Sequence, residues 1–310
     1  MIGIADVRAA AARIRGLVHR TPVLTSATLD REVGASVWCK CENLQKVGAF
    51  KARGACNAVM ALSAEAAARG VVTHSSGNHG AALAYAAASR GIPCAVVMPD
   101  SAPAVKVEAV RGYGAEVRFC KAADRERVCG ELQRERGMEL VHPFENPLVI
   151  AGQGTAAVEL LEDVPELDVV VTPVGGGGLC AGTAVAVAAL RPSCAVWGAE
   201  PLAVDDAARS MATGVRQPRV DGAKSWADGL MTGLGAPNFE LLRARGVRVV
   251  TVGEEAIVDA CRWFLTRMKI VVEPSGAVAL AALRAAAGEL AGRRVGLVLS
   301  GGNTDFRWLS

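Results

Sequence analysis

The residues best suited to chemistry surround a lysine in the segment Gly48-Ala49-Phe50-Lys51-Ala52-Arg53-Gly54-Ala55. An extended run at residues 35–40 precedes it and an apolar run at residues 55–60 follows it, so Lys51 is expected between a strand and a helix. Small neighbours leave the amine partly desolvated yet reachable. Desolvation lowers the pKa of an amine and makes it a nucleophile able to form a Schiff base. Taken alone, the segment favours a solvated loop lysine over a desolvated nucleophile, because most lysines lie at the surface.

A second candidate is a polar turn, His74-Ser75-Ser76-Gly77-Asn78-His79-Gly80, directly after the β-branched run 71–73. Backbone N–H groups, two hydroxyls and an amide at the start of a helix form an anion site, which suits a carboxylate. Simple helix capping is the alternative. Capping needs one such residue, whereas this turn holds four polar side chains in five positions.

Two further turns follow apolar runs. Four consecutive glycines come after the run 169–174 and before an alanine-rich stretch: Gly175, Gly176, Gly177 and Gly178. Glycines let the backbone wrap an anion without side chains in the way, which predicts a phosphate cradle. The segment lacks the Gly-Lys-Ser/Thr ending of a nucleotide P-loop. The other turn, Leu299-Ser300-Gly301-Gly302-Asn303, places a hydroxyl at a strand end, although it could equally be a bare turn.

Strand-like and helix-like segments alternate along most of the chain. Strands are expected at 70–73, 94–98, 116–119, 169–172, 195–197, 247–250 and 295–299, and helices at 5–16, 79–90, 104–112, 152–162, 178–190, 254–268 and 275–287. Such alternation predicts an α/β fold with parallel sheets covered on both faces. In these folds ligands bind beyond the carboxyl ends of the strands, where the turns described above lie.

Composition excludes several classes of partner. The 310 residues are 51% hydrophobic and 21% charged with a net charge of +3, which is too mild for a nucleic-acid or membrane-surface protein. We find neither a membrane-spanning run nor a signal sequence, so a cytoplasmic location is expected. The nine cysteines lie mostly in apolar runs and are expected to be reduced core residues. Cys39 and Cys41 lack the spacing of a zinc site.

Five of these segments, in order, resemble the fold-type II pyridoxal-phosphate enzymes, most closely the serine/threonine dehydratase and serine racemase family. They are the lysine segment, the turn 75–80, Val149-Ile150-Ala151-Gly152-Gln153-Gly154-Thr155, the four glycines and Ser300-Gly301-Gly302-Asn303. The resemblance spans almost the whole chain. It implies two parallel-sheet α/β domains with pyridoxal 5'-phosphate between them: a large domain of residues 1–69 and 148–310, and a small mobile domain of residues 70–147.

The resemblance also implies a role for individual residues. Lys51 holds the cofactor as a Schiff base and removes the α-proton, while Asn78 binds the ring hydroxyl and Ser300 faces the ring nitrogen. The cofactor-binding set is Phe50, Lys51, Asn78, Gly175, Gly176, Gly177, Gly178, Glu273 and Ser300. The substrate carboxylate is assigned to Ser75, Ser76, Asn78 and His79. Ser76 is also a catalytic candidate, on the face of the cofactor opposite Lys51.

The implied reaction is an ammonia-lyase (dehydratase) reaction that converts L-threonine or L-serine to a 2-keto acid and ammonia by β-elimination through an aminoacrylate. Serine racemisation is a second expected activity, although Thr232-Gly233 replaces a serine pair that some racemases carry, which argues against strong racemase activity. Two alternatives stay open within this class: β-replacement, and lyase action on 3-hydroxyaspartate, which an extra cationic group in the pocket would favour. A homodimer is expected from the family.

A cation site and a different enzyme class also need consideration. Glu200, Val204 and Asp206 resemble the family's divalent-cation site for Mg²⁺ or Ca²⁺. An acidic helix start is the alternative there. Gly176-x-Gly178-x-x-Ala181, with Glu200 about twenty residues on, also satisfies the fingerprint of an NAD-dependent oxidoreductase. That alternative gives no role to Lys51 or to the polar turn. A non-catalytic sensor that keeps the fold is a third possibility, against which the intact Lys51, Asn78 and Ser300 argue.

Overall fold

The computed structural model describes residues 2–75, 77–102 and 104–309, so the expected catalytic residue Ser76 lies outside the described residues. The strands are β1 (Val23–Thr25), β2 (Ser36–Lys40), β3 (Val71–His74), β4 (Cys94–Pro99), β5 (Glu116–Cys120), β6 (Glu139–Leu140), β7 (Val169–Pro173), β8 (Ala195–Pro201), β9 (Arg248–Val252) and β10 (Arg294–Val298). The α-helices are α1 (Ile4–Arg13), α2 (Ala27–Val33), α3 (Lys51–Met60), α4 (Ala64–Arg69), α5 (Asn78–Arg90), α6 (Ala104–Gly112), α7 (Arg125–Arg136), α8 (Pro147–Asp163), α9 (Gly178–Leu190), α10 (Asp206–Thr213), α11 (Ala236–Arg243), α12 (Glu254–Trp263), α13 (Pro274–Ala285) and α14 (Ala287–Leu290). Short 3₁₀ turns are η1 (Glu42–Leu44), η2 (Lys46–Gly48), η3 (Ala122–Asp124), η4 (Leu202–Val204), η5 (Asp228–Leu230) and η7 (Arg307–Leu309), and η6 (Phe264–Met268) is a π-helix.

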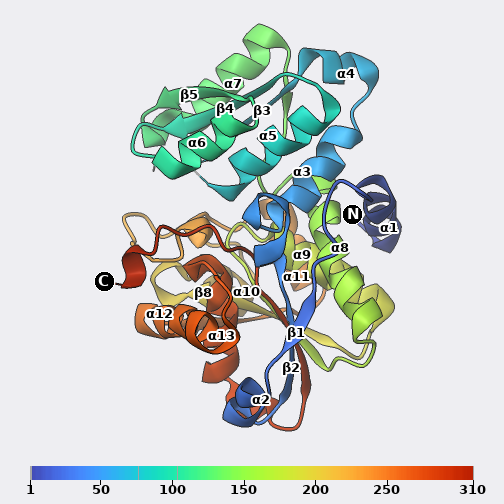
Figure 1. Cartoon of the computed structure of the whole chain (residues 1–310), viewed down its shortest axis with the longest axis vertical. Coiled ribbons are helices and arrows are strands. Elements are labelled where there is room, and N and C mark those ends of the chain that lie inside the picture. Colours follow the sequence, from blue (N-terminus) through green and yellow to red (C-terminus); the bar gives the residue numbers. More distant parts are fainter. Residues whose placement is uncertain (1, 76, 103, 310) are drawn as a thin grey trace.

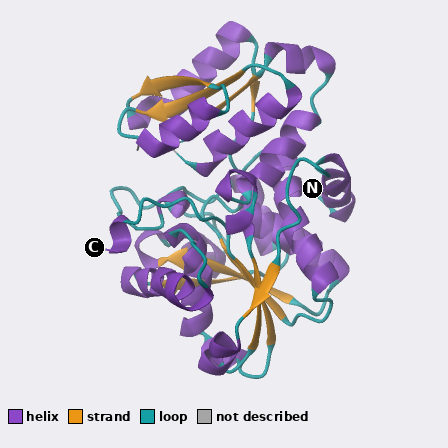
Figure 2. Ribbon diagram, viewed as in Figure 1, coloured by secondary structure: helices purple, strands orange, loops and turns teal. Residues whose placement is uncertain are grey.

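The strands form two separate sheets, which Figure 2 shows as two groups. The larger sheet has the order β1-β2-β10-β7-β8-β9, and the smaller has the order β5-β4-β3-β6. All neighbours in both sheets run parallel except β1 and β2, which are antiparallel at the edge of the larger sheet. The predicted α/β fold with two parallel sheets is therefore confirmed, with β1 as the exception.

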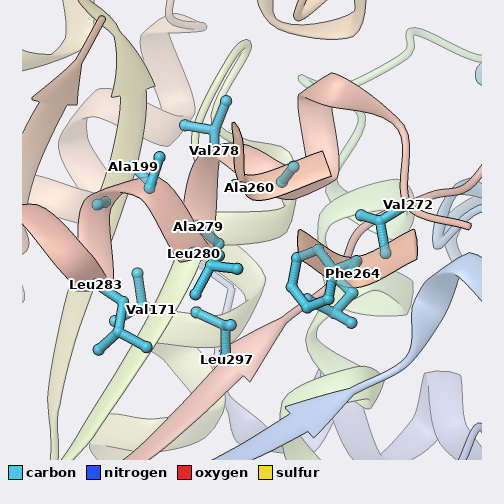
Figure 3. Close-up of a cluster of buried hydrophobic side chains, with 14 of the residues drawn as sticks. Val171, Ala199, Ala260, Phe264, Val272, Val278, Ala279, Leu280, Leu283 and Leu297 are labelled. Carbon is cyan, nitrogen blue, oxygen red and sulfur yellow. The ribbon is translucent and has the colours of Figure 1, made fainter. Parts of the chain in front are cut away.

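Both faces of the larger sheet are covered by helices. Along β7, Val169 and Val171 pack into a cluster with α2, α12 and α13, whereas Val170 packs on the opposite side with α8 and α9. Side chains alternate across a strand, so a strand buried on both faces is apolar at every position. Figure 3 shows Leu280 of α13 close to Leu297 of β10 inside the first cluster. Each such buried leucine contributes about 1.5–3 kcal/mol of apolar transfer.

The smaller sheet is built the same way with fewer elements. Val72 packs with α7 on one face, and Val71 packs with α5 and α6 on the other. The cluster that contains Val71 also includes Ala55 and Cys56 of α3, a helix that precedes the smaller sheet in the chain. Figure 1 accordingly shows α3 at the junction of the two halves. All strands of the smaller sheet fall within the expected small domain, residues 70–147, although its core extends across residue 70 into α3.

The three motif turns all lie at carboxyl ends of strands. The polar turn follows β3 of the smaller sheet, while the glycines follow β7 and Ser300 follows β10 of the larger sheet. The two sheets therefore face each other with the edges at which parallel sheets bind ligands. Within the described ranges, the helices are too short or too polar for any of them to cross a membrane.

Candidate active site

Lys51 is the first residue of α3, and the segment after β10 fixes its position. The N–H of Phe50 donates to the Ser300 carbonyl at 3.0 Å, and Ala49 forms an antiparallel bridge with Gly301. These contacts fasten the turn before Lys51 to the residues that follow β10. The start of α3 is therefore held at the carboxyl edge of the larger sheet.

The amine of Lys51 is half-buried and has a neutral partner. Nζ donates to the Pro143 carbonyl at 2.8 Å and lies 5.0 Å from the ring centroid of Phe50. No carboxylate of the described ranges forms an ion pair with it. Burial therefore lowers the pKa of Lys51 to about 8, because desolvation disfavours the charged amine. A substantial fraction of the amine is then neutral, and so nucleophilic, near physiological pH.

The polar turn between β3 and α5 is shaped by its own side chains. Ser75 Oγ accepts the N–H of Gly77 at 3.2 Å. His79, the second residue of α5, is buried with Nε2 at 3.0 Å from the Val141 carbonyl. Its Nδ1 has no hydrogen-bond partner within the described ranges. Burial, together with the charge of Lys51, holds the pKa of His79 well below its usual range, so the ring is neutral.

Asn78, Glu273 and Asn303 form a hydrogen-bonded chain between the two sheets. Asn78 Nδ2 donates to Glu273 Oε1 at 2.7 Å, and Asn303 Nδ2 donates to Asn78 Oδ1 at 2.9 Å. Burial, and then the negative charge of Asp228, raise the pKa of Glu273 to about 8. Glu273 is thus a largely neutral acid at pH 7, and the network adds little net charge to the site.

The glycine loop leads from β7 into α9. Gly175 (φ +53°) and Gly177 (φ +90°) adopt left-handed conformations that side chains disfavour. A Cβ on Gly177 would lie 2.7 Å from Asn238, and one on Gly176 would collide with the ring of Phe144. Close packing behind the loop therefore allows only glycine, and the loop presents bare backbone at the N-terminus of the 13-residue helix α9, where anions are favoured.

A cavity of about 760 Å³ between the two sheets brings most of the predicted site residues together. Its lining includes Phe50, Lys51, Ser75, Asn78, His79, Gly176, Gly177, Gly178, Glu273 and Ser300. Gly175, the first residue of the loop, is not part of the lining, and a Cβ on it would lie 3.0 Å from Leu230. Ser76 lies outside the described residues.

Sequence reasoning placed His74 in the polar turn without giving it a role of its own, and it missed a second histidine of this cavity, His142. His74 and His142 are in edge-to-face contact with ring centroids 5.4 Å apart, and His142 contacts Phe144 in the same way at 4.7 Å. Burial, and then His142, lower the pKa of His74 to about 4, and burial also lowers the pKa of His142. His74 directly precedes Ser75, so its position at the end of a strand was a usable signal.

Sequence reasoning also missed the cationic side chains of the cavity. Arg125 begins α7, and Arg216 and Arg219 lie in the segment between α10 and η5. Lys106 of α6 lines the cavity as well and pairs with Asp228. The extra cationic groups that would favour a 3-hydroxyaspartate lyase are therefore present. Their spacing in the sequence carried no signal, because two of the arginines lie in a segment without regular structure.

The predicted cation-binding residues lie apart from this cavity, at the end of β8 and the start of α10. Glu200 and Asp206 are both buried. Glu200 accepts the N–H groups of Ala207 and Ala208 at 3.1 and 2.9 Å, so it caps α10. Asp206 Oδ2 accepts the N–H of Leu234 at 2.8 Å, whereas Oδ1 has no partner within the described ranges.

Burial disfavours the charged forms of Glu200 and Asp206. Burial is the main cause that raises the pKa of Glu200 to about 8, and the neighbouring Asp206 adds to it. No group of three or more His, Cys, Asp or Glu side chains in the described ranges could hold a metal ion. Any cation here would need backbone carbonyl or water oxygens in addition to the two carboxylates.

Residues 14–301 match the family described as "Pyridoxal-phosphate dependent enzyme". The chain belongs to this family. The match accounts for Lys51 and the glycine loop together, which the dinucleotide fingerprint does not. The predicted enzyme class, a pyridoxal-phosphate enzyme similar to serine racemases and threonine deaminases, is confirmed.

Individual relatives are similar over their full length. The chain is 45% identical to the serine racemase of Dictyostelium discoideum, covering 100% of this chain and 97% of that protein. It is 46% identical to an L-threo-3-hydroxyaspartate ammonia-lyase of Pseudomonas sp, covering 97% of this chain and 95% of that protein. The crystal structure of a threonine deaminase from T.th. superposes with a TM-score of 0.94 at 46% identity, covering 98% of this chain and 99% of that chain.

The residues present fit the family's cofactor. The glycine loop and the N-terminus of α9 offer bare backbone to a phosphate, and Lys51 offers a neutral amine in the same cavity. The Ser300 hydroxyl also lines this cavity. Phosphate, aldehyde and ring of pyridoxal phosphate therefore each have a chemically suitable partner in this one cavity.

Proposed function

We propose that this chain is a pyridoxal-phosphate-dependent ammonia-lyase that removes water from a small L-β-hydroxy amino acid, threonine or serine, to give a 2-keto acid and ammonia. The observation that carries the proposal is the half-buried Lys51 amine, whose pKa is lowered to about 8, in one cavity with the polar turn and the glycine loop. When bound, the cofactor withdraws electrons from the substrate α-carbon and so makes its proton acidic.

In this proposal the protein supplies binding and proton transfer. The turn carrying Ser75 and Asn78 binds the substrate carboxylate at the N-terminus of α5. Lys51 Nζ would accept the substrate α-proton as a general base. The neutral His79 and the largely neutral Glu273 line the site without adding a charge that would hold the Lys51 amine protonated.

Two observations bear on the substrate and on a second activity. Relatives include both a serine racemase and an L-threo-3-hydroxyaspartate ammonia-lyase. The arginines that line the cavity favour 3-hydroxyaspartate as a second candidate substrate. Racemisation needs an acid–base group opposite Lys51, and we assign that role to Ser76 on the resemblance alone.

The test is a visible absorption spectrum of the purified protein before and after borohydride, followed by a keto-acid assay on L-serine, L-threonine and 3-hydroxyaspartate. We expect an absorption band that borohydride removes, and keto-acid formation from at least one substrate. Lys51→Ala should lose both, whereas Lys121→Ala, an exposed lysine after β5, should keep both. A protein that binds pyridoxal phosphate yet forms no keto acid would contradict the proposed function.

We further propose that Glu200, Asp206 and the Val204 carbonyl hold Mg²⁺ or Ca²⁺. Support comes from the two buried carboxylates and from the unpartnered Asp206 Oδ1 among the described residues. Either ion should raise the melting temperature of the wild type, and Asp206→Asn should abolish this increase. Asp205→Asn is the matched control, because Asp205 pairs with Arg209 instead. An unchanged melting temperature of the wild type with both ions would exclude the site.

The homodimer expected from the family and a cytoplasmic location also stay proposals. All nine cysteines are free thiols, as a reducing compartment requires. Light scattering on a sizing column should give twice the chain mass of 32.0 kDa, and the chain mass itself would exclude a stable dimer.

A further inference from the structure

One part of the cavity wall is formed by the segment that follows α10 together with the segment 232–235. Arg216 and Arg219 come from the first segment, and Thr232 and Gly233 come from the second. None of these four residues takes part in the proton transfer or the α-carboxylate binding proposed above. All of them line the same cavity as Lys51 and Ser75.

Hydrogen bonds from α10 hold the arginine segment in place. The N–H of Gln217 donates to the buried Ser210 Oγ at 2.7 Å, and Arg209 Nη2 donates to the Pro218 carbonyl at 3.2 Å. Arg216 Nη1 in turn donates to the Leu234 carbonyl at 3.0 Å. The two arginines therefore project from a fixed backbone rather than from a free loop.

The absence of a side chain at Gly233 leaves space for Arg219 at the cavity lining. A Cβ built on Gly233 would lie 3.2 Å from Arg219 Cβ, a contact tight enough that Arg219 would have to shift by a few tenths of an ångström. Gly233 does not have a left-handed backbone, so space rather than conformation makes glycine suitable here. A hydroxyl residue at position 233 would push against Arg219. The glycine and the arginine thus form one structural unit.

Within the part of the chain that the structure describes, neither arginine is paired with a buried acid. Arg219 pairs with Asp221 at 2.9 Å, but both side chains are exposed, and such surface pairs contribute little. Among the described residues, no carboxylate forms an ion pair with Arg216. The acids that line the cavity are engaged elsewhere or face the histidines: Asp228 pairs with Lys106, Asn78 donates to Glu273, Ala236 donates to Glu145, and Glu126 faces His74.

We propose that Arg219, together with Arg216, determines substrate specificity by binding a second carboxylate on the β-carbon of the substrate. The planar guanidinium group of arginine binds a carboxylate through two parallel hydrogen bonds. The substrates L-serine and L-threonine have no second carboxylate to accept them. The substrate class is thus a β-hydroxy amino acid with a β-carboxylate, such as 3-hydroxyaspartate. Because this assignment presupposes ammonia-lyase chemistry, it rests on the proposed function.

The test measures kcat/KM of the holoenzyme for L-threo-3-hydroxyaspartate and for L-serine, and takes their ratio. Arg219→Ala should lower this ratio about 10- to 100-fold, the effect of losing one hydrogen bond between charged groups. Arg219→Lys should lower it less, because lysine keeps the charge but not the planar guanidinium group. Arg243→Ala, an exposed arginine of α11 that pairs with Glu240, is the matched control and should leave the ratio unchanged.

Gly233→Ser tests the coupling between the two residues. It should also lower the ratio, because the new Cβ displaces Arg219. Combined with Arg219→Ala it should lower the ratio no further than Arg219→Ala alone, since contacting residues are not additive. If the decreases of the kcat/KM ratio in the two single variants added fully in the double variant, Gly233 and Arg219 would act independently, which would contradict the proposed coupling.

A binding measurement separates recognition from turnover. Succinate, a four-carbon dicarboxylate, should raise the melting temperature of the holoenzyme more than butyrate does. Arg219→Ala should remove the difference, and Arg243→Ala should keep it. An unchanged ratio and an unchanged succinate effect in Arg219→Ala would overturn the proposal, as would loss of selectivity only in Arg125→Ala. A wild type that converts serine or threonine but not 3-hydroxyaspartate would overturn it as well, while leaving the proposed function intact.

Discussion

At the scale of single residues, burial lowers the pKa of the Lys51 amine, and no acid of the described ranges forms an ion pair with it. A carboxylate beside Lys51 would hold it charged, and the structure instead gives its Nζ a neutral carbonyl from Pro143. The neighbouring His79 is neutral because burial and the charge of Lys51 lower its pKa. Burial of Lys51 therefore favours its uncharged amine.

We predict that the rate at which the apoenzyme takes up pyridoxal phosphate follows the neutral fraction of Lys51. The pKa of Lys51 is lowered to about 8, so the rate should rise roughly tenfold per pH unit up to about pH 8 and level off above it. Growth of the visible absorption band after mixing measures this rate. A rate that keeps rising up to pH 10 would show that Lys51 is solvated.

At the scale of elements, a buried ionic network holds α3, the helix that begins with Lys51. Arg53, fully buried, donates to Glu42 of η1 at 2.7 Å and to Glu159 of α8 at 2.7 Å. Lys40 of β2 pairs with the same Glu159 at 2.6 Å. Two cations and two carboxylates thus balance one another. They connect β2, η1 and α8 to α3, the helix that begins with Lys51.

We predict that Arg53→Met destabilises the protein by about 3–5 kcal/mol, because it leaves Glu42 buried without a counter-charge. Urea unfolding measures the loss. Arg20→Met is the control, since Arg20 pairs with Glu162 and Asp163 at the surface and should contribute about 0–1 kcal/mol. A similar, small effect of both substitutions would mean that the network does not stabilise α3.

Elements with strong apolar patterns could be predicted from the sequence. The expected helices 104–112 and 178–190 coincide with α6 and α9. By contrast, α7 was missed because most of its residues are charged and only Cys129 and Leu132 are buried. The helix expected at 254–268 ends at Trp263 and continues as a π-helix, and no local pattern signals that change.

The site residues also fall into those that the sequence could predict and those that it could not. The lysine segment, the polar turn and the glycines were recognisable because their chemistry is local, and all three lie at one cavity. Arg219 and His142 could not be assigned, because only the tertiary fold brings them to that cavity. Residues 21–24 were expected to be extended because of Pro22, but the antiparallel pairing of β1 with β2 was not predicted, since strand pairing is decided by neighbours distant in sequence.

At the scale of the whole molecule, polar contacts cross the cavity between the two sheets. Lys106 of α6 pairs with Asp228 of η5, and Lys106 Nζ also lies next to Gly77 of the polar turn. Asn78 reaches Glu273 from the other side of that turn. The smaller half therefore contacts the larger one beside the proposed carboxylate site. We propose that substrate binding there draws the two halves together and excludes water.

We predict that Lys106→Met weakens this closure. The pair is half-exposed, with 21% and 54% of the two side chains accessible, so its loss should raise KM by up to about fivefold, which corresponds to about 1 kcal/mol. Added salt should raise KM more in the wild type than in the variant, because ions also screen the exposed pair that only the wild type has. Lys121→Met, which removes an exposed lysine from the same half, is the control and should behave as the wild type. Small-angle scattering gives an independent measurement: the radius of gyration should fall when a substrate analogue binds to the wild type, and fall less in Lys106→Met. Identical scattering with and without the analogue would mean that the two halves do not move. The cavity would then have to exclude water by side-chain packing alone.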